Sequence, residues 1–229
     1  MNPGRRSAAQ TRHPGSDKRH LRTLYKEQRR RELAQRQPQI LERLLQLLNG
    51  WPSLARPGGL GLYWPLEGEV DLRPLVQKIP HEHRRLALPA IWEGQLVYRP
   101  WQPGMPLHPD ACGIPAPPPE AGQLTAGQLG LLLIPALAID QQGIRLGYGA
   151  GWYDRLRSQA EWQQVPSVAV LPANCVCSVL PQDSWDVPLD GWVSEHGLTL
   201  ATPARDTTYQ QPLHGPGEQR TDLPGSVDR

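Results

Sequence analysis

The amino-acid sequence predicts an α/β protein, a single three-layer domain in which helices flank a mostly parallel central sheet. The first observation behind this prediction is the alternation of short apolar runs with amphipathic stretches, which is typical of strand, helix, strand units. The second is an apolar run over residues 129–134, as expected of a strand buried on both faces of a parallel sheet. The 229 residues, 38% of them hydrophobic and 20% charged, exclude wholesale disorder and a collagen-like chain.

Both ends of the chain are predicted to be disordered extensions of a domain that spans residues 17–200. Residues 1–16 hold almost no large apolar side chains and cannot offset the entropy of ordering; a transit peptide is a less favoured alternative. Residues 201–229 hold four prolines and three glycines. No apolar run reaches the ~18 to 20 residues of a membrane span, and no signal peptide precedes residue 21. The odd number of cysteines, three, favours a reducing compartment, so we expect a cytoplasmic protein.

The first elements of the domain are two helices, which we expect to pack near the ligand cleft. Asp17 is a suitable N-cap for a helix over residues 17–34, whose apolar stripe includes Leu21, Tyr25 and Leu33. Pro38 then predicts a break. A second helix starts at Pro38, carries apolar residues at spacings of three and four up to residue 48, and stops at Asn49-Gly50.

The remaining elements follow from the apolar pattern. Strands are predicted over residues 60–64, 86–91, 129–134, 165–171 and 192–200, and helices over residues 69–79 and 151–164. Residues 100–128 contain many prolines and glycines, so we expect an irregular path there, with a short hairpin around residues 95–99.

Charge is divided unevenly along the chain, and the basic part suggests an anionic partner. Residues 1–50 hold 12 Lys/Arg against 4 Asp/Glu, whereas the rest holds 12 against 18. The anion could be nucleic acid, a membrane surface or a phosphorylated small molecule. On the first helix one basic face contains Lys18, Arg22, Lys26 and Arg29. The face is either simply solvated, or it lies across the cleft so that its leading charges neutralise a triphosphate.

A glycine-rich loop after the strand over residues 129–134 is the most informative segment. Gly147, Gly149 and Gly151 alternate just before a helix, and such loops let the backbone approach an anionic ligand closely. Arg145 adds a charge with forked donors, and Asp154 can hold a divalent cation that bridges phosphates. The alternatives are a mobile turn and an Asp154 that complements the helix dipole. The loop is neither a dinucleotide fingerprint nor a P-loop.

Two further segments carry candidate residues. Trp64 and Glu69 follow the first strand, where they can stack on and hydrogen-bond a heterocycle; Glu69 can equally be a helix-start charge. The segment from Asp186 to Asp190 is either a turn or a second acid near a metal. The pairs His81/His83 and Cys175/Cys177 lack a second pair at zinc-site spacing, and no nucleophile signature is present.

Together these segments resemble the 5-formyltetrahydrofolate cyclo-ligase family. The specific match is Pro135, Asp140, Gly143, Arg145-Leu146-Gly147, Gly149 and Gly151 to Arg155. Weaker matches, in the same order along the chain, are Lys18 to Arg22, Glu69-Val70-Asp71, Leu88-Pro89, Cys112 to Pro117 and Asp186 to Asp190. The chain departs from the family pattern at Ala136 and Ile139, where Gly and Phe are usual, and at Trp152, which replaces a Tyr.

The resemblance implies a ligase of folate one-carbon metabolism that needs ATP and Mg²⁺. It implies catalytic roles for Lys18, Arg145 and Tyr153, and metal binding by Asp154 and Asp190. ATP would be bound by Lys18, Arg22, Arg145, Leu146, Gly147, Tyr148, Gly149, Ala150, Gly151, Trp152 and Tyr153. The folate would be bound by Trp64, Glu69, Tyr148, Gly149, Ala150, Gly151 and Trp152.

Two alternatives to this enzyme stay open. One is a homologue that keeps the fold but only binds folate or nucleotide, although every charged position named above is filled. The other is a nucleic-acid-binding protein that uses the basic segment; it lacks an aromatic stacking platform there, and the rest of the chain is acidic. We expect small-molecule partners, 5-formyltetrahydrofolate and ATP, without nucleic acid or membrane, and a monomer.

Overall fold

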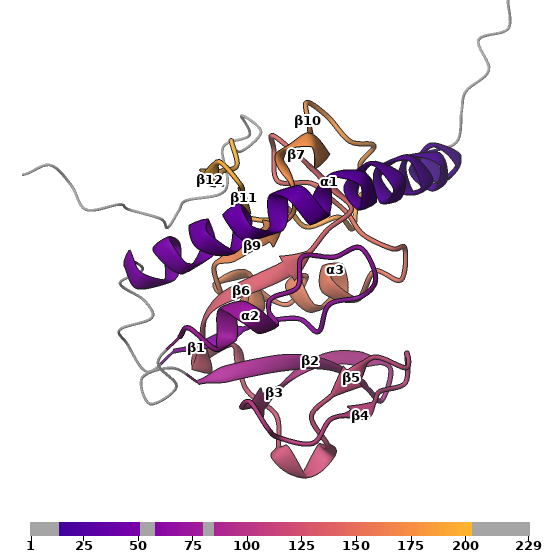
Figure 1. Cartoon of the computed structure of the whole chain (residues 1–229). Helices are drawn as coiled ribbons and strands as arrows, with labels where there is room; N and C mark the ends of the chain where they lie inside the picture. The colour runs from indigo at the N-terminus through magenta and orange to yellow at the C-terminus, as the bar shows by residue number, and fades with distance from the viewer. Residues whose placement is uncertain (1–13, 51–57, 80–84, 203–229) are drawn as a thin grey trace, which may run out of the picture.

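A seven-stranded sheet forms the centre of the computed structural model, which describes residues 14–50, 58–79 and 85–202 (Figure 1). The strand order is β12-β11-β9-β6-β1-β2-β3. Its members are β1 (Gly59–Gly61), β2 (Leu86–Trp92), β3 (Gln95–Trp101), β6 (Leu129–Pro135), β9 (Ser167–Val170), β11 (Gly191–Ser194) and β12 (Gly197–Leu200). All central pairs are parallel, and only β3 and β12, at the two edges, run antiparallel to their neighbours. The predicted mostly parallel α/β fold is therefore confirmed.

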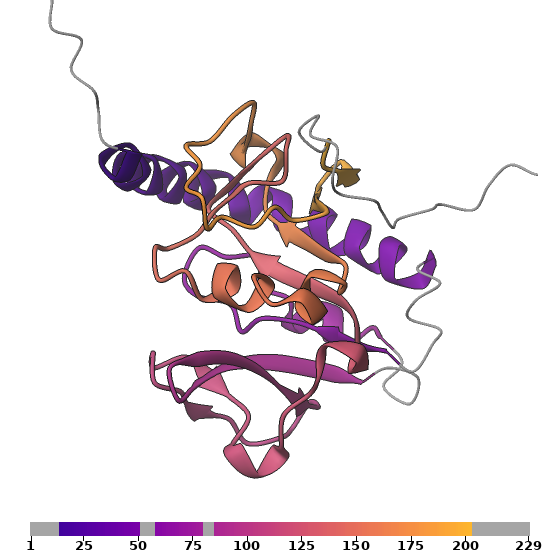
Figure 2. The same cartoon turned by 180° about the vertical axis from the view of Figure 1, so that it is seen from behind.

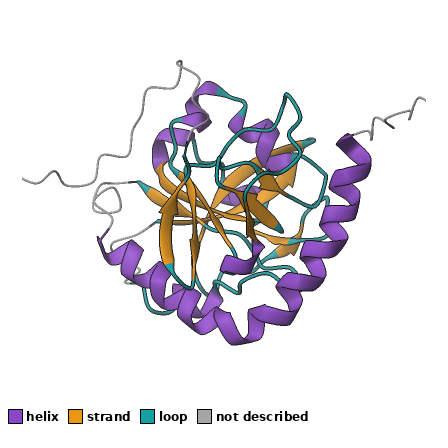
Figure 3. Ribbon diagram, turned by 90° about the horizontal axis from the view of Figure 1, so that it is seen from above, coloured by secondary structure: helices purple, strands orange, loops and turns teal. Residues whose placement is uncertain are grey.

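Helices cover both faces of this sheet and give three layers. On one face lie α1 (Pro14–Gly50) and α2 (Arg73–Val76); on the other lie α3 (Trp152–Arg157) and α4 (Ala160–Gln163) (Figures 2 and 3). The two faces have separate apolar clusters. Ile40, Leu44 and Leu75 belong to the first cluster, whereas Leu156 and Trp162 belong to the second. Alternate residues of the central strands contribute to opposite clusters, because successive side chains of a strand point to opposite faces.

The N-terminal segment is one continuous helix, so the predicted break at Pro38 is wrong. Pro38 lies inside α1, which curves along the sheet (Figure 3). A proline inside a helix costs about 3 kcal/mol, because it removes one hydrogen bond and crowds the preceding turn. Ile40, Leu44 and Leu48 follow it, each at most 1% exposed. Each such side chain contributes about 1.5–3 kcal/mol on burial, so packing outweighs the local cost.

Several other predicted elements are shorter or divided. The strand expected over residues 60–64 is β1, which ends at Gly61, and the strand expected over residues 165–171 is β9. The helix expected over residues 69–79 is only the short α2, because Pro74 is tolerated only in a first helical turn. The helix expected over residues 151–164 is divided into α3 and α4, where Gln159 adopts an extended conformation. The strand expected over residues 192–200 is the hairpin of β11 and β12, in which Ser194 pairs with Gly197. The strand over residues 95–99 pairs with β2 as a full hairpin.

Two small sheets complete the structure. One contains β7 (Ala138–Asp140), β8 (Arg145–Leu146) and β10 (Val176–Cys177), in the order β10-β7-β8. The other pairs β4 (His108–Pro109) with β5 (Pro115–Ala116) within the region expected to be irregular. Short 3₁₀ helices, η3 (Pro119–Ala121), η4 (Ala126–Gln128) and η5 (Ala173–Cys175), connect the strands. Within the described parts of the chain, no helix combines the length and apolar character needed to cross a bilayer.

The connections of β1 and β6 diverge where these adjacent strands end. From β1 the chain passes through α2 to β2 on one side, and from β6 it passes through α3 to β9 on the other. Such a switch point leaves a crevice beyond the carboxyl ends of parallel strands, where α/β proteins bind ligands. The helix predicted to start at residue 17 begins three residues earlier, at Pro14. Disorder was predicted for residues 1–16 and 201–229. Of these, residues 1–13 and 203–229 lie outside the described residues.

Candidate functional site

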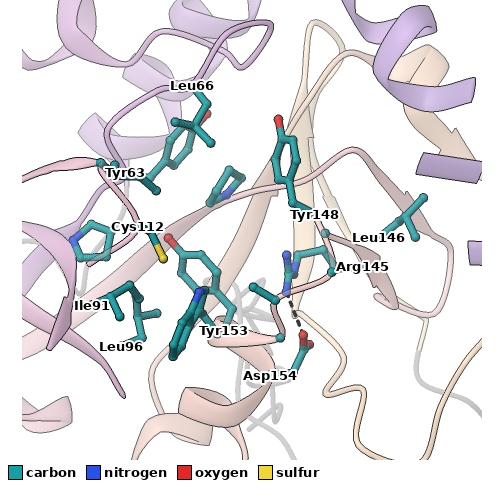
Figure 4. Close-up of a pocket in the computed structure, with 18 of the residues that line it drawn as sticks. Tyr63, Leu66, Ile91, Leu96, Cys112, Arg145, Leu146, Tyr148, Tyr153 and Asp154 are labelled. Atoms are coloured by element: carbon teal, nitrogen blue, oxygen red, sulfur yellow. Dashed lines mark hydrogen bonds and ion pairs between the residues drawn. The ribbon is translucent and has the colours of Figure 1, made fainter. Parts of the chain in front are cut away.

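A cavity of about 410 Å³ lies at this switch point (Figure 4). Its walls come from the segment after β1, from the loop between β6 and α3, from the start of α1, from β2, β3 and the residues around 110–114, and from the turn at residues 183–186. In the close-up, Tyr63, Tyr148 and Tyr153 surround one space, with Arg145 and Asp154 beside it. The glycine loop and two residues of the N-terminal basic face, Lys18 and Arg22, are separated by more than a hundred residues but line one cavity.

The glycine loop needs its glycines at two positions. Gly149 has φ +107° and Gly151 has φ +67°, in the region that side chains disfavour. A Cβ on Gly149 would also lie 3.3 Å from the Cζ atom of Arg22. The Arg22 Nε in turn donates to the Gly147 carbonyl at 3.0 Å. The first helix therefore contacts the loop directly, as the hypothesis of a helix across the cleft requires.

Arg145 and Asp154 form an ion pair at the cavity wall. Their Nη2 and Oδ2 atoms are 3.0 Å apart, and both side chains are largely buried. The Arg145 guanidinium also lies 5.4 Å from the ring centroid of Tyr153. Burial raises the pKa of Tyr153 well above its usual value, so this phenol keeps its proton at neutral pH. The Tyr153 hydroxyl can thus donate a hydrogen bond.

Lys18 is bound to two carboxylates of the turn at residues 183–186. Its Nζ lies 2.7 Å from Asp183 Oδ2 and 2.5 Å from Asp186 Oδ2. Asp186 Oδ2 also accepts the Asp183 N–H at 2.7 Å, which fixes the turn. Although burial opposes the charged ammonium, the two carboxylates offset it and the pKa of Lys18 is raised. Asp183 and the exposed Trp185, which line the same cavity, were not predicted from the sequence.

Arg29 connects α1 to the site from inside the protein. It is 1% exposed, and its Nη1 donates to the Ala136 carbonyl at 2.8 Å while its Nη2 donates to the Tyr148 hydroxyl. Ala136, one of the departures noted in the sequence, is 0% exposed in the core. The helical spacing predicted one basic face that Arg29 shares with Lys18, Arg22 and Lys26. In the structure only Lys26 of these four is exposed.

Glu69 lines the cavity from the segment after β1, close to Tyr148 of the glycine loop. It is 5% exposed, its Oε2 accepts the Leu66 N–H at 2.9 Å, and its Oε1 has no hydrogen-bond partner among the described residues. Burial raises the pKa of Glu69, and the Leu66 N–H and the Arg29 charge offset part of this rise. The neighbouring Trp64 packs edge-on against Trp101, with ring centroids 6.4 Å apart. An oriented acid and an aromatic ring therefore share this wall.

The cavity brings together every predicted site residue except Asp190. Asp190 directly precedes β11 and therefore lies at the amino end of the parallel strands. The cavity lies at the other end, beyond the carboxyl ends of these strands. Asp190 Oδ2 accepts the Ser167 N–H at 2.7 Å and lies 3.8 Å from Arg157 Nη2. The prediction that Asp190 binds a metal beside Asp154 is therefore wrong: Asp190 joins β9 to β11.

Metal ligands are sparse in the described structure. No group of three or more His, Cys, Asp or Glu side chains is arranged to hold an ion within residues 14–50, 58–79 and 85–202. Cys175 and Cys177 are free thiols, and burial raises the pKa of Cys175 to about 12. His81 and His83 lie outside the described residues. Of the two carboxylates predicted to bind a metal, only that of Asp154 lines the cavity.

Known proteins resemble this chain over most of its length. The family model of the 5-formyltetrahydrofolate cyclo-ligase family matches residues 14–195. The 5-formyltetrahydrofolate cyclo-ligase of Escherichia coli K12 is 28% identical over 174 residues, which are 73% of this chain and 94% of that protein. That of Haemophilus influenzae is 30% identical over 136 residues, 57% and 72% of the two chains. The 5,10-methenyltetrahydrofolate synthetase of Aquifex aeolicus superposes with a TM-score of 0.68 at 27% identity, covering 86% of this chain and 99% of that one.

Proposed function

The chain belongs to the 5-formyltetrahydrofolate cyclo-ligase family and is an enzyme, and on this premise we propose that its cavity converts 5-formyltetrahydrofolate to 5,10-methenyltetrahydrofolate. The reaction would consume ATP, require Mg²⁺, and release ADP and phosphate. One observation carries the proposal: three cationic side chains, the glycine loop, a buried acid and an aromatic ring line the same cavity. A triphosphate and a heterocycle can thus be held next to each other.

The proposed reaction has two steps. The formyl oxygen attacks the γ-phosphorus of ATP, an O–P bond forms, and the bond between the γ-phosphorus and the ADP oxygen breaks. The N10 nitrogen then attacks the activated formyl carbon and closes the ring, the bond from that carbon to the phosphorylated oxygen breaks, phosphate leaves, and the N10 proton passes to solvent. Neither step needs a protein nucleophile. Phosphoryl transfer depends mainly on positioning and charge stabilisation, and the cationic side chains that line the cavity support this proposal.

On the nucleotide side, charged donors and backbone would hold the phosphates. We propose that Lys18, Arg22 and Arg145 provide the cations, and that residues 146–153 provide the loop around the triphosphate. Arg145 suits phosphate oxygens because its guanidinium is planar and always charged. Tyr153, which stays protonated, would donate a hydrogen bond to the transferring group. Lys18 and Arg145 would stabilise the charge that develops during transfer.

On the folate side, Glu69, Trp64 and residues 148–152 would position the ring system. The Oε1 atom of Glu69 is free for N–H groups of the substrate among the described contacts, while Oε2 is held by Leu66. Trp64 offers an apolar ring that Trp101 fixes from one side. We propose that the formyl group lies beside Glu69 and the neighbouring Tyr148 of the glycine loop, within reach of the γ-phosphate.

The residues present fit a magnesium ion that arrives with the nucleotide. Mg²⁺ prefers oxygen ligands and is commonly bound by one or two carboxylates plus substrate phosphates and water. Asp154 supplies one carboxylate at the cavity wall, and its side chain is 16% exposed. When bound, the ion would neutralise phosphate charge and orient the transferring group. Asp190, at the amino end of the parallel strands, takes no part in this proposal.

The enzyme is proposed to act as a cytoplasmic monomer on small molecules. The three cysteines form no disulfide within the described residues, which agrees with a reducing compartment. The site faces a cavity and not an extended basic surface, which favours a small phosphorylated ligand over nucleic acid or membrane. The alternative is a homologue that binds folate or nucleotide without turnover.

A direct assay decides between turnover and binding alone. The purified full chain with 5-formyltetrahydrofolate and MgATP should produce the near-ultraviolet absorbance of the methenyl product. Omission of ATP, or chelation of the divalent ion, should abolish the signal. Folded protein that binds both substrates without producing this absorbance would refute the proposed reaction and support the binding module.

A further inference from the structure

Tyr98, on β3, carries a buried hydroxyl group on the side of the sheet that α3 covers. The residue is 0% exposed, and its hydroxyl makes no hydrogen bond of normal geometry among the described residues. Most buried polar groups are paired, because an unpaired hydroxyl in the core costs free energy that a phenylalanine at the same place would not. Packing alone therefore does not explain why this residue is a tyrosine.

The ring of Tyr98 is held from two directions, so the position of its hydroxyl is defined. It stacks on Trp162 of α4, with ring centroids 5.8 Å apart and an angle of 26° between the planes. The ring also reaches across β2 to Gly61 of β1, where a Cβ would lie only 2.9 Å from the Tyr98 Cε1 atom. Gly61 thus makes room for the ring.

The hydroxyl of Tyr98 has the hydroxyl of Tyr153 as its neighbour. Tyr153 belongs to α3, which packs against β3, and both tyrosines contribute to the same apolar cluster. Tyr153 is the polar group that acts most strongly on Tyr98, whereas Arg157, which also acts on it, is a cation and cannot accept a hydrogen bond. Burial raises the pKa of Tyr153, and the Tyr98 hydroxyl offsets part of this rise, as expected of a donor that faces the Tyr153 oxygen.

Tyr153 also lines the cavity, where its ring lies 5.4 Å from the Arg145 guanidinium (Figure 4). A hydroxyl group has one proton to donate, and its oxygen can accept a second hydrogen bond at the same time. When Tyr98 donates to the Tyr153 oxygen, the Tyr153 proton is left for a group in the cavity. A hydroxyl that accepts in this way is also polarised into a stronger donor.

We propose that Tyr98 is a positioning residue, which donates a hydrogen bond to the Tyr153 oxygen when substrates occupy the cavity and so directs the Tyr153 proton to the transferring phosphoryl group. Such hydrogen bonds are often long in a ligand-free enzyme and shorten when the substrate binds. Tyr98 is not among the residues that line the cavity, so it acts from behind the cavity wall. This inference rests on the proposed phosphoryl transfer and adds a residue to it.

Tyr98→Phe tests the inference, because it removes the hydroxyl and keeps the ring between Trp162 and Gly61. The kcat for formation of the methenyl product should fall about three- to tenfold, which corresponds to the loss of one neutral hydrogen bond. The KM values for both substrates should stay within about twofold, since the hydrogen bond acts on the transferring group. The melting temperature should stay the same or rise, because an unpaired buried hydroxyl is removed.

A double-mutant cycle with Tyr153→Phe shows whether Tyr98 acts through Tyr153. In the Tyr153→Phe background, Tyr98→Phe should change kcat by less than about 1.5-fold, because the group that Tyr98 positions is gone. Tyr25→Phe is the matched control. Its hydroxyl lies beside the Cys177 thiol, and Tyr25 is not among the residues that line the cavity, so this variant should keep the wild-type kcat.

Three results would overturn the inference. A wild-type kcat in Tyr98→Phe would leave Tyr98 only a place in the core. An equal loss of kcat with and without the Tyr153 hydroxyl would show that Tyr98 does not act through Tyr153. In both cases the wild type is active, so the proposed function survives. Wild-type protein without turnover would instead refute the proposed function and this inference together.

Discussion

Replacing Arg29 by methionine should destabilise the fold and loosen the folate side of the site together. Methionine keeps most of the buried stem, so the change removes the guanidinium rather than opening a large cavity. The Ala136 carbonyl, 0% exposed as a residue, loses the 2.8 Å hydrogen bond from Nη1. A buried carbonyl without its donor costs about 1–3 kcal/mol. Tyr148 is 43% exposed, so water can replace its partner at little cost.

The free energy of unfolding should therefore fall by about 2 kcal/mol, which for a domain of this size lowers the melting temperature by roughly 4–8 °C. Urea denaturation at neutral pH measures the first quantity and calorimetry the second. Because the Arg29 charge also acts on Glu69, the KM for 5-formyltetrahydrofolate should rise more than the KM for ATP. The control is Arg30→Met, since Arg30 is exposed and pairs only with Glu27 among the described residues. Equal stabilities of the two variants would refute a role for Arg29 as a buried anchor.

Four other substitutions test individual parts of the site. Arg145→Ala should raise the KM for ATP on the order of tenfold or more while circular dichroism stays unchanged, and wild-type kinetics would remove Arg145 from the site. Asp154→Asn should raise the magnesium concentration needed for half-maximal rate; an unaltered magnesium titration would leave Asp154 only its ion pair with Arg145. Gly149→Ala should lower the free energy of unfolding by about 1–2 kcal/mol and weaken ATP binding, because φ is +107° there; an unchanged melting temperature would contradict this. Burial raises the pKa of Glu69, so the folded state binds the proton more tightly than the unfolded state does. The neutral carboxyl therefore stabilises the fold at pH values below the unfolded-state pKa, and this stabilisation is lost as the pH rises through the folded-state pKa. The urea midpoint of Glu69→Gln should consequently decline less than that of the wild type from acid to neutral pH, and parallel declines would contradict the raised pKa.

The parallel sheet could be predicted from the sequence because its strands are short apolar runs with clear boundaries. Residues 129–134 are the best example, and β6 has nearly those bounds. The course of α1 could not be predicted in this way. Local chemistry at Pro38 favours a break, and only the burial of Ile40 and Leu44 in the tertiary structure reverses that preference. Pro74, by contrast, is a local signal for a short α2, but the apolar pattern of residues 69–79 favours a longer helix and obscures that signal.

The candidate site was predictable where its residues belong to one long motif, as Arg145 and Asp154 do. The site was less predictable where the role of a residue depends on contacts with segments far away in the sequence. Asp190 follows Asp186 in the sequence, yet it lies at the amino end of the parallel strands, directly before β11, a separation that spacing alone does not reveal. Asp183 and Arg29 have no motif, and their partners Lys18 and Tyr148 lie more than a hundred residues away.

The transfer of the formyl oxygen to phosphate tests the proposed chemistry most directly. The full chain is incubated with MgATP and 5-formyltetrahydrofolate labelled with ¹⁸O in the formyl group, and the released phosphate is analysed by mass spectrometry. If the formyl oxygen attacks the γ-phosphorus, each methenyl product should be accompanied by one phosphate that carries the label. Unlabelled phosphate formed together with methenyl product would contradict activation of the formyl oxygen by ATP at this site.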